Sequence, residues 1–138
     1  MVKFNKESLL LLQEKVYKHT GQKIIVKDYD LLDSAIESVF QTFGRLDLYP
    51  STEEKGARLC FNIINNHPFV DGNKRVGVLV MLCFLQINDV NIKYSNEEII
   101  NVGLSVACGK TNYQQLVDWV NNHKMATNQT TNQNEPVK

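Results

Sequence analysis

The chain of 138 residues contains few cysteines and few prolines, lacks a long apolar run and has no excess of charge of either sign. Its 15 Lys and Arg residues balance its 15 Asp and Glu residues. Proteins that bind nucleic-acid phosphates or anionic lipid usually carry a basic surplus, so we expect neither a nucleic-acid nor a membrane partner. The longest apolar run, residues 76–85, is far shorter than the ~20 residues of a membrane span and predicts a buried helix.

The three cysteines, Cys60, Cys83 and Cys108, lie far apart and form no CxxC pair. Each has apolar neighbours, which predicts three reduced cysteines in the core rather than a disulfide or a zinc site. The chain turns polar within its first residues and has no small-residue cleavage site there, so we expect no signal peptide and a cytoplasmic location.

The apolar periodicity predicts an all-α domain of about six helices, without internal repeats. The first covers residues 5–19 and stops at Gly21, and the second is capped by Asp28 or Asp30. A capping box of Ser51 with Glu54 opens a third helix over 51–65, and a fourth is expected over 73–88. Two more are expected after capping boxes of Ser95 with Glu98 and of Thr111 with Gln114. The helix over 73–88 is apolar nearly all round and should be the central one.

Three segments fall outside this helical pattern. Residues 24–26 form a short apolar run that could be a strand or a packed loop, and residues 43–50 lie between glycine and proline and read as a loop or small hairpin. From residue 125 the chain is rich in Thr, Asn and Gln, with almost no apolar residues. We therefore predict one domain over 1–124 and a disordered polar tail over 125–138.

The loop before the central helix has a backbone suited to bringing a ligand close. Pro68 fixes one φ angle, and Phe69 should anchor the loop in the core. Gly72 allows the backbone to approach a ligand, and Asn73 is a natural N-cap. The first amides of the following helix then lack internal partners and carry partial positive charge, which predicts a phosphate site.

The side chains of this loop suit phosphoryl or nucleotidyl transfer. Arg75 offers a planar cation for phosphate oxygens, and Asp71 is a hard oxygen ligand for Mg²⁺. His67 can accept a proton from a hydroxyl near neutral pH. Each feature alone is more often a turn or a solvated face. Their conjunction at one helix N-terminus favours a catalytic site.

The run from His67 to Arg75, HPFVDGNKR, resembles the signature of the Fic/Doc superfamily, HPFx(D/E)GN(G/K)R. Residues 5–120 resemble its death-on-curing branch. The resemblance implies a Fic-fold bundle and an ATP- and Mg²⁺-dependent transferase acting on a protein hydroxyl. It implies His67 as general base, Asp71 as Mg²⁺ ligand, Asn73 and Arg75 as phosphate contacts, with Arg75 also catalytic, and Gly72 in the anion-binding turn.

The resemblance also implies partners. Residues Gly44, Arg45, Leu46, Asp47 and Leu48 resemble the family's flap, which holds a target peptide by strand-like pairing. The family link implies a toxin with a separate small antitoxin, and the branch suggests a translation elongation factor as target. A catalytically silent peptide-binding module is the alternative from another class. The intact His67, Asp71 and Arg75 disfavour it, since a silent module needs none of these three together.

The motif is mixed in what it says about the transferred group. AMP-transferring members mostly have glycine where this chain has Lys74, and the death-on-curing branch has lysine there and transfers the γ-phosphate. Gly72, however, is the choice of the AMP transferases. A lysine beside the turn can block one nucleotide subsite and attract phosphates elsewhere, so we expect Lys74 to contact the nucleotide. We predict phosphoryl transfer, with adenylyl transfer as the alternative.

Overall fold

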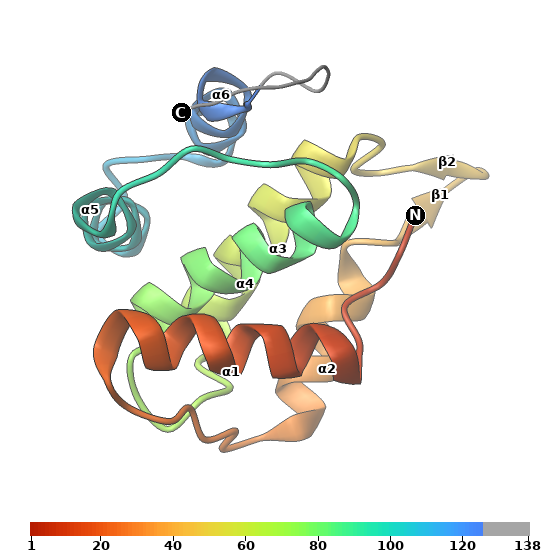
Figure 1. Cartoon of the computed structure of the whole chain (residues 1–138). Coiled ribbons are helices and arrows are strands. Elements are labelled where there is room, and N and C mark those ends of the chain that lie inside the picture. The colour runs from red at the N-terminus through yellow and green to blue at the C-terminus, as the bar shows by residue number, and fades with distance from the viewer. Residues whose placement is uncertain (126–138) are drawn as a thin grey trace.

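The computed structural model describes residues 1–125, which form six α-helices and one two-stranded hairpin (Figure 1). In chain order these are α1 (Lys6–Thr20), α2 (Tyr29–Ser38), β1 (Thr42–Phe43), β2 (Leu46–Asp47), α3 (Thr52–Asn66), α4 (Asn73–Ile87), α5 (Asn96–Ala107) and α6 (Tyr113–His123). The all-α prediction is confirmed. The predicted tail lies outside the described residues, apart from Met125, whose amide donates to the carbonyl of Asn91.

Helix α4 occupies the centre of the bundle. It packs beside α3, with α1 on one side and α5 on another (Figure 1). All of residues 76–85 are buried, as expected for a helix that is apolar nearly all round. No helix within residues 1–125 is both long and apolar enough to cross a membrane.

Local capping explains where the helices begin. The predicted boxes of Ser51 with Glu54 and of Ser95 with Glu98 are both present. The predicted box of Thr111 with Gln114 is wrong by one residue, because Asn112 pairs with Gln115 instead. Asparagine is a stronger N-cap than threonine, which accounts for the helix being capped by Asn112 and not by Thr111. Of the two candidates for the second helix, Asp28 is the cap and accepts from the amide of Leu31.

The cysteine prediction is right for two residues and wrong for the third. Cys60 and Cys83 are buried in the core, where burial raises the pKa of both thiols, that of Cys83 to about 12. Cys108 is exposed instead. It is the C-cap of α5, where the helix ends and its apolar stripe no longer continues into the core.

Residues 42–47 form a hairpin rather than an irregular loop. Thr42 pairs with Asp47 and Phe43 with Leu46 in antiparallel register. The two turn residues, Gly44 and Arg45, both have positive φ, at 58° and 71°. Two consecutive turn residues with positive φ give the backbone a twist that matches the right-handed twist of the strands. The two strands can therefore be joined by only two residues.

Candidate active site

The loop from His67 to Asn73 is tied down from inside the protein. The Phe69 side chain is buried in the core. The Asn73 side chain is buried as well, and its Oδ1 accepts from the Phe69 amide at 3.1 Å while its Nδ2 donates to the Phe69 carbonyl at 3.0 Å. This pair of hydrogen bonds closes the loop on itself.

The predicted N-cap role of Asn73 is therefore wrong. Helix α4 has Gly72 as its N-cap, at φ 70°, and Asn73 as its first helical residue. Glycine reaches this left-handed conformation without steric cost, so the chain can turn sharply there. Because the Asn73 side chain is occupied by Phe69, only its backbone amide can contribute to an anion site.

A second tie comes from the segment between α1 and α2. Val26 forms an isolated β-bridge with Phe69, and the Val70 amide donates to the Ile25 carbonyl at 2.9 Å. The Lys27 amide donates to the Pro68 carbonyl at 2.7 Å. The apolar run at 24–26 therefore holds the motif loop in place through backbone pairing. Sequence reasoning noticed the run but could not connect it with the motif, because the pairing is long-range.

The N-terminus of α4 is open. No side chain caps it, whereas each of the other five helices within residues 1–125 has a side-chain cap. Lys74 and Arg75 stand exposed in its first turn. Unpartnered amides at the positive end of a helix dipole attract anions, and the two cations add to that attraction.

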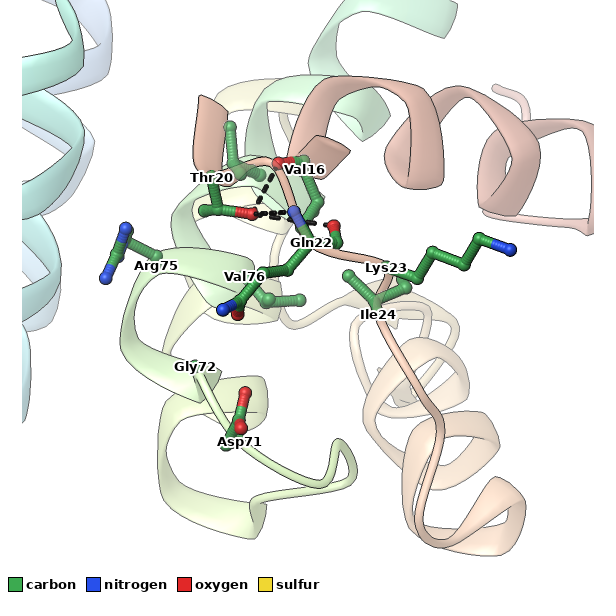
Figure 2. Close-up of a pocket in the computed structure, with 10 residues that line it drawn as sticks. Val16, Thr20, Gln22, Lys23, Ile24, Asp71, Gly72, Arg75 and Val76 are labelled. Carbon is green, nitrogen blue, oxygen red and sulfur yellow. Dashed lines mark hydrogen bonds between the residues drawn. The ribbon is translucent and has the colours of Figure 1, made fainter. Parts of the chain in front are cut away.

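Two cavities lie on either side of this helix end. The first, of about 350 Å³, lies between the end of α1 and the motif (Figure 2). Asp71, Gly72 and Arg75 line one wall of it, and Thr20 and Gln22 contribute to the opposite wall. Figure 2 shows Gln22 extending from the turn after α1 toward the motif side. Sequence reasoning missed Thr20 and Gln22, since only packing brings α1 to the motif.

The second cavity, of about 390 Å³, lies between the motif and α5. His67, Lys74 and Arg75 line it together with the exposed apolar side chains of Ile100 and Leu104. Gly72 and Arg75 border both cavities. The structure therefore gathers all the predicted motif residues around one helix end, with Asp71 on one side of it and His67 on the other.

His67 has an unusual backbone. It is the C-cap of α3, with φ 53° and ψ 54°, and its amide donates to the Ile63 carbonyl at 3.1 Å. Histidine is one of the few residues other than glycine that is enriched in this left-handed region. The conformation turns the chain out of α3 and leaves the ring exposed at the cavity. Within residues 1–125 no side chain hydrogen-bonds that ring, so its nitrogens are available to a substrate.

Asp71 fits a Mg²⁺ site of a particular kind. Its carboxylate is exposed and lines the first cavity beside Gly72. The described residues contain no cluster of three His, Cys, Asp or Glu side chains that could hold a metal. Mg²⁺ commonly binds through one or two carboxylates, substrate phosphates and water, so Asp71 could serve as its protein ligand only together with a bound nucleotide.

The predicted flap residues, Gly44 to Leu48, lie away from the motif. The hairpin precedes α3 and His67 follows it, so the 15 residues of α3 separate them (Figure 1). At 1.5 Å per residue the helix is ~22 Å long. None of the hairpin residues lines either cavity at the motif. The structure thus groups the motif residues and sets the hairpin apart.

Comparison with known proteins identifies relatives that share this region. Residues 3–85, from before α1 into α4, match the Fic/DOC family. Over 72 residues the chain is 39% identical to Toxin Doc of Mycolicibacterium smegmatis (strain ATCC 700084 / mc(2)155), an alignment that covers 52% of this chain and 55% of that protein. The chain thus spans about half the length of the curated relative it matches.

Proposed function

Because this chain belongs to the Fic/DOC family, we propose that it is a toxin that transfers a phosphoryl group from ATP to a hydroxyl of another protein. One observation carries the proposal. The uncapped N-terminus of α4 stands between two cavities, with a free histidine in one and a carboxylate in the other. This arrangement suits a phosphate chain held at the helix end while a hydroxyl approaches from the side of His67.

The roles follow from the chemistry of each group. The first amides of α4 and the Arg75 guanidinium would bind phosphate oxygens. Asp71 would hold Mg²⁺, which neutralises phosphate charge when bound. The attacking hydroxyl oxygen forms a bond to phosphorus as the bond to the leaving nucleotide oxygen breaks. His67 takes the hydroxyl proton, so charge does not build up on the nucleophile.

Lys74 supports transfer of the γ-phosphate. Its side chain is exposed at the cavity that also contains His67. The helix end has few free amides, so the phosphates that occupy them decide which phosphorus faces His67. A lysine there takes up room and attracts phosphate, which favours presenting the γ-phosphorus. Gly72 supports the alternative, adenylyl transfer, because glycine is the residue that the AMP-transferring family members carry at this position.

The partners belong to the same proposal. The matching Mycolicibacterium protein bears the name Toxin Doc, which supports a toxin–antitoxin setting with a separate small antitoxin. The target would be a cytoplasmic protein with an accessible Ser, Thr or Tyr, and a translation elongation factor is the candidate that the resemblance suggests. The hairpin, at the far end of α3, would hold a part of the target remote from the modified hydroxyl.

Labelled ATP tests the proposal. The protein is incubated with a bacterial lysate and Mg²⁺, with ATP carrying the label at either the α- or the γ-phosphate, and His67→Ala is the inactive control. We expect label on a lysate protein only from γ-labelled ATP, and weaker labelling with Lys74→Gly. Label from the α-position alone would establish the adenylyl alternative. No label from either, with folded protein, would favour a silent binding module.

A further inference from the structure

The hairpin has little structure of its own to hold it. Each strand has two residues, and all four of these residues are exposed, including Phe43 and Leu46. The Leu48 amide donates to the Gln41 carbonyl at 3.0 Å and closes the base. A two-stranded hairpin of this size is marginal in water on its own. Its orientation must therefore come from contacts with the rest of the protein.

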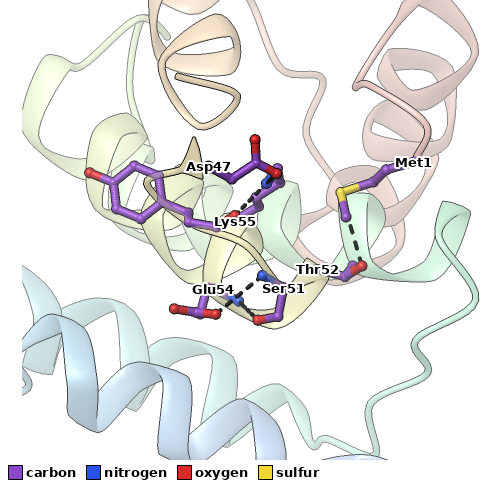
Figure 3. Close-up of polar contacts among 7 residues, drawn as sticks. Met1, Asp47, Ser51, Thr52, Glu54 and Lys55 are labelled. Atoms are coloured by element: carbon purple, nitrogen blue, oxygen red, sulfur yellow. Dashed lines mark hydrogen bonds and ion pairs between the residues drawn. The ribbon is translucent and has the colours of Figure 1, made fainter. Parts of the chain in front are cut away.

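Lys55 in the first turn of α3 makes those contacts. It is only 2% exposed, which is rare for lysine because an unpaired buried ammonium is costly. Its Nζ donates to Asp47 Oδ2 at 3.3 Å (Figure 3) and to the carbonyl of Tyr49. The same Nζ lies 5.6 Å from the ring centre of Phe40, just before β1. One cation thus contacts the chain on both sides of the hairpin.

The contacts of Tyr49 strengthen this anchor. Its ring packs edge-on against Tyr113 of α6, with 5.8 Å between ring centres. The Arg58 guanidinium, one turn after Lys55, lies 5.8 Å from the centre of the Tyr49 ring. The residue that receives the Lys55 hydrogen bond is therefore itself held by two helices, so Lys55 connects the hairpin to a rigid support.

We propose that Lys55 is a positioning residue that holds the hairpin in one orientation and so prepares it to bind the target protein. The inference rests on the proposed function, in which the hairpin contacts the target. Lys55 touches neither cavity at the motif and stands near the opposite end of α3 from His67. It should therefore govern binding of the target and leave the chemical step alone.

The first test needs no substrate. Arg45 at the hairpin tip is a trypsin site, and cleavage there requires the hairpin to leave its support. Lys55→Met keeps an unbranched side chain of similar size but removes the ammonium group. It should speed cleavage after Arg45 about tenfold or more, as measured by intact-mass spectrometry. Lys18→Met, at a side chain that is 75% exposed on α1, is the matched control and should match wild type. An unchanged rate in Lys55→Met would overturn the proposal.

The second test measures catalysis with the lysate protein that wild type labels. We expect Lys55→Met to raise the lysate concentration for half-maximal labelling about tenfold and to leave the plateau rate within about twofold. A lower plateau at an unchanged half-maximal concentration would indicate a general structural role and overturn the proposal. Asp47→Asn, which keeps the Tyr49 contact, should produce a smaller shift in the same direction. It also serves as the test variant if Lys55→Met does not fold.

The two proposals can fail separately. If wild type labels no protein from either form of ATP, the proposed function is wrong, and the trypsin measurement alone decides whether Lys55 holds the hairpin. If wild type labels its target and Lys55→Met changes neither cleavage nor half-maximal concentration, the proposed function stands and the role of Lys55 is wrong.

Discussion

His67 combines a strained backbone with a free side chain. A left-handed conformation at a residue other than glycine costs free energy, and such residues concentrate at functional sites. Here the conformation directs the chain from α3 into the motif loop and the ring into the cavity. A residue at position 67 must therefore adopt the left-handed backbone conformation and also supply the side-chain chemistry of the site.

Replacing His67 should separate these two constraints. His67→Ala should lower the transfer rate by about 10²–10⁴-fold, because the hydroxyl proton then has no acceptor. His67→Asn, which tolerates the left-handed conformation, should be equally inactive and closer to wild type in stability. Labelling rates measure the loss of activity, and urea unfolding measures the stability of the two variants. A His67→Asn variant that labels at the wild-type rate would contradict the role as base.

Asp71 should act through the metal and not through the fold, because its carboxylate is exposed at the cavity. Asp71→Asn removes the charged ligand and leaves the helix amides. We therefore expect nucleotide binding in the presence of Mg²⁺ to weaken about tenfold or more, with little change in its absence. Calorimetry with a non-hydrolysable ATP analogue measures both. An equal loss with and without Mg²⁺ would refute this assignment.

The first turn of α4 lies directly against α5 at Gly103. A Cβ added at Gly103 would lie 2.6 Å from the carbonyl oxygen of Lys74, which is closer than such atoms can come. Glycine is therefore required where the two helices meet. Lys74, whose side chain lines the cavity, owes its place partly to this backbone contact.

Gly103→Ala should push α5 away from the site. Overpacking against backbone costs about 1–3 kcal/mol of unfolding free energy, and transfer should fall because the cavity between the motif and α5 is distorted. Gly56→Ala in α3 is the matched control, since its Cβ would meet side-chain atoms and no backbone, the nearest of them in Leu85 at 2.9 Å. It should cost less, because that side chain can move. Urea unfolding of both variants measures the two losses of unfolding free energy. Equal losses would contradict the expected difference between a clash with backbone and a clash with a side chain.

The protein as a whole should lose stability in alkali. Burial raises the pKa of the Cys60 thiol, and raises the pKa of Cys83 from 9.0 to about 12. Burial and the Glu54 charge raise the pKa of Tyr113 to about 12. The folded state holds these protons more tightly than the unfolded chain does. Their stabilisation is complete below about pH 9 and decreases as the pH rises from there toward 12.

Urea unfolding at pH 8 and pH 10.5 measures this effect. We expect a lower midpoint at pH 10.5, and a smaller drop in Cys83→Ala, which has no thiol to ionise there. Cys108→Ala should behave as wild type, because Cys108 is exposed. Midpoints that coincide at the two pH values would show that the buried thiols do not control alkaline stability.

The sequence alone was enough for several features that depend on neighbours three or four residues away. The capping boxes at Ser51 and Ser95 are local hydrogen bonds, and the apolar pattern of residues 76–85 predicts a central helix. The motif was recognisable for the same reason, since nine consecutive residues carry its chemistry. These features needed no knowledge of the rest of the chain.

Only the tertiary structure decided the features that depend on distant segments. It pairs Val26 with Phe69 and brings Thr20 and Gln22, at the end of α1, to the wall of the cavity opposite the motif. It also buries Lys55 of α3 against Asp47 of the hairpin. In each case the partner lies on another element, and the direction in which a side chain points depends on how the elements pack, which the order of residues along the chain does not specify.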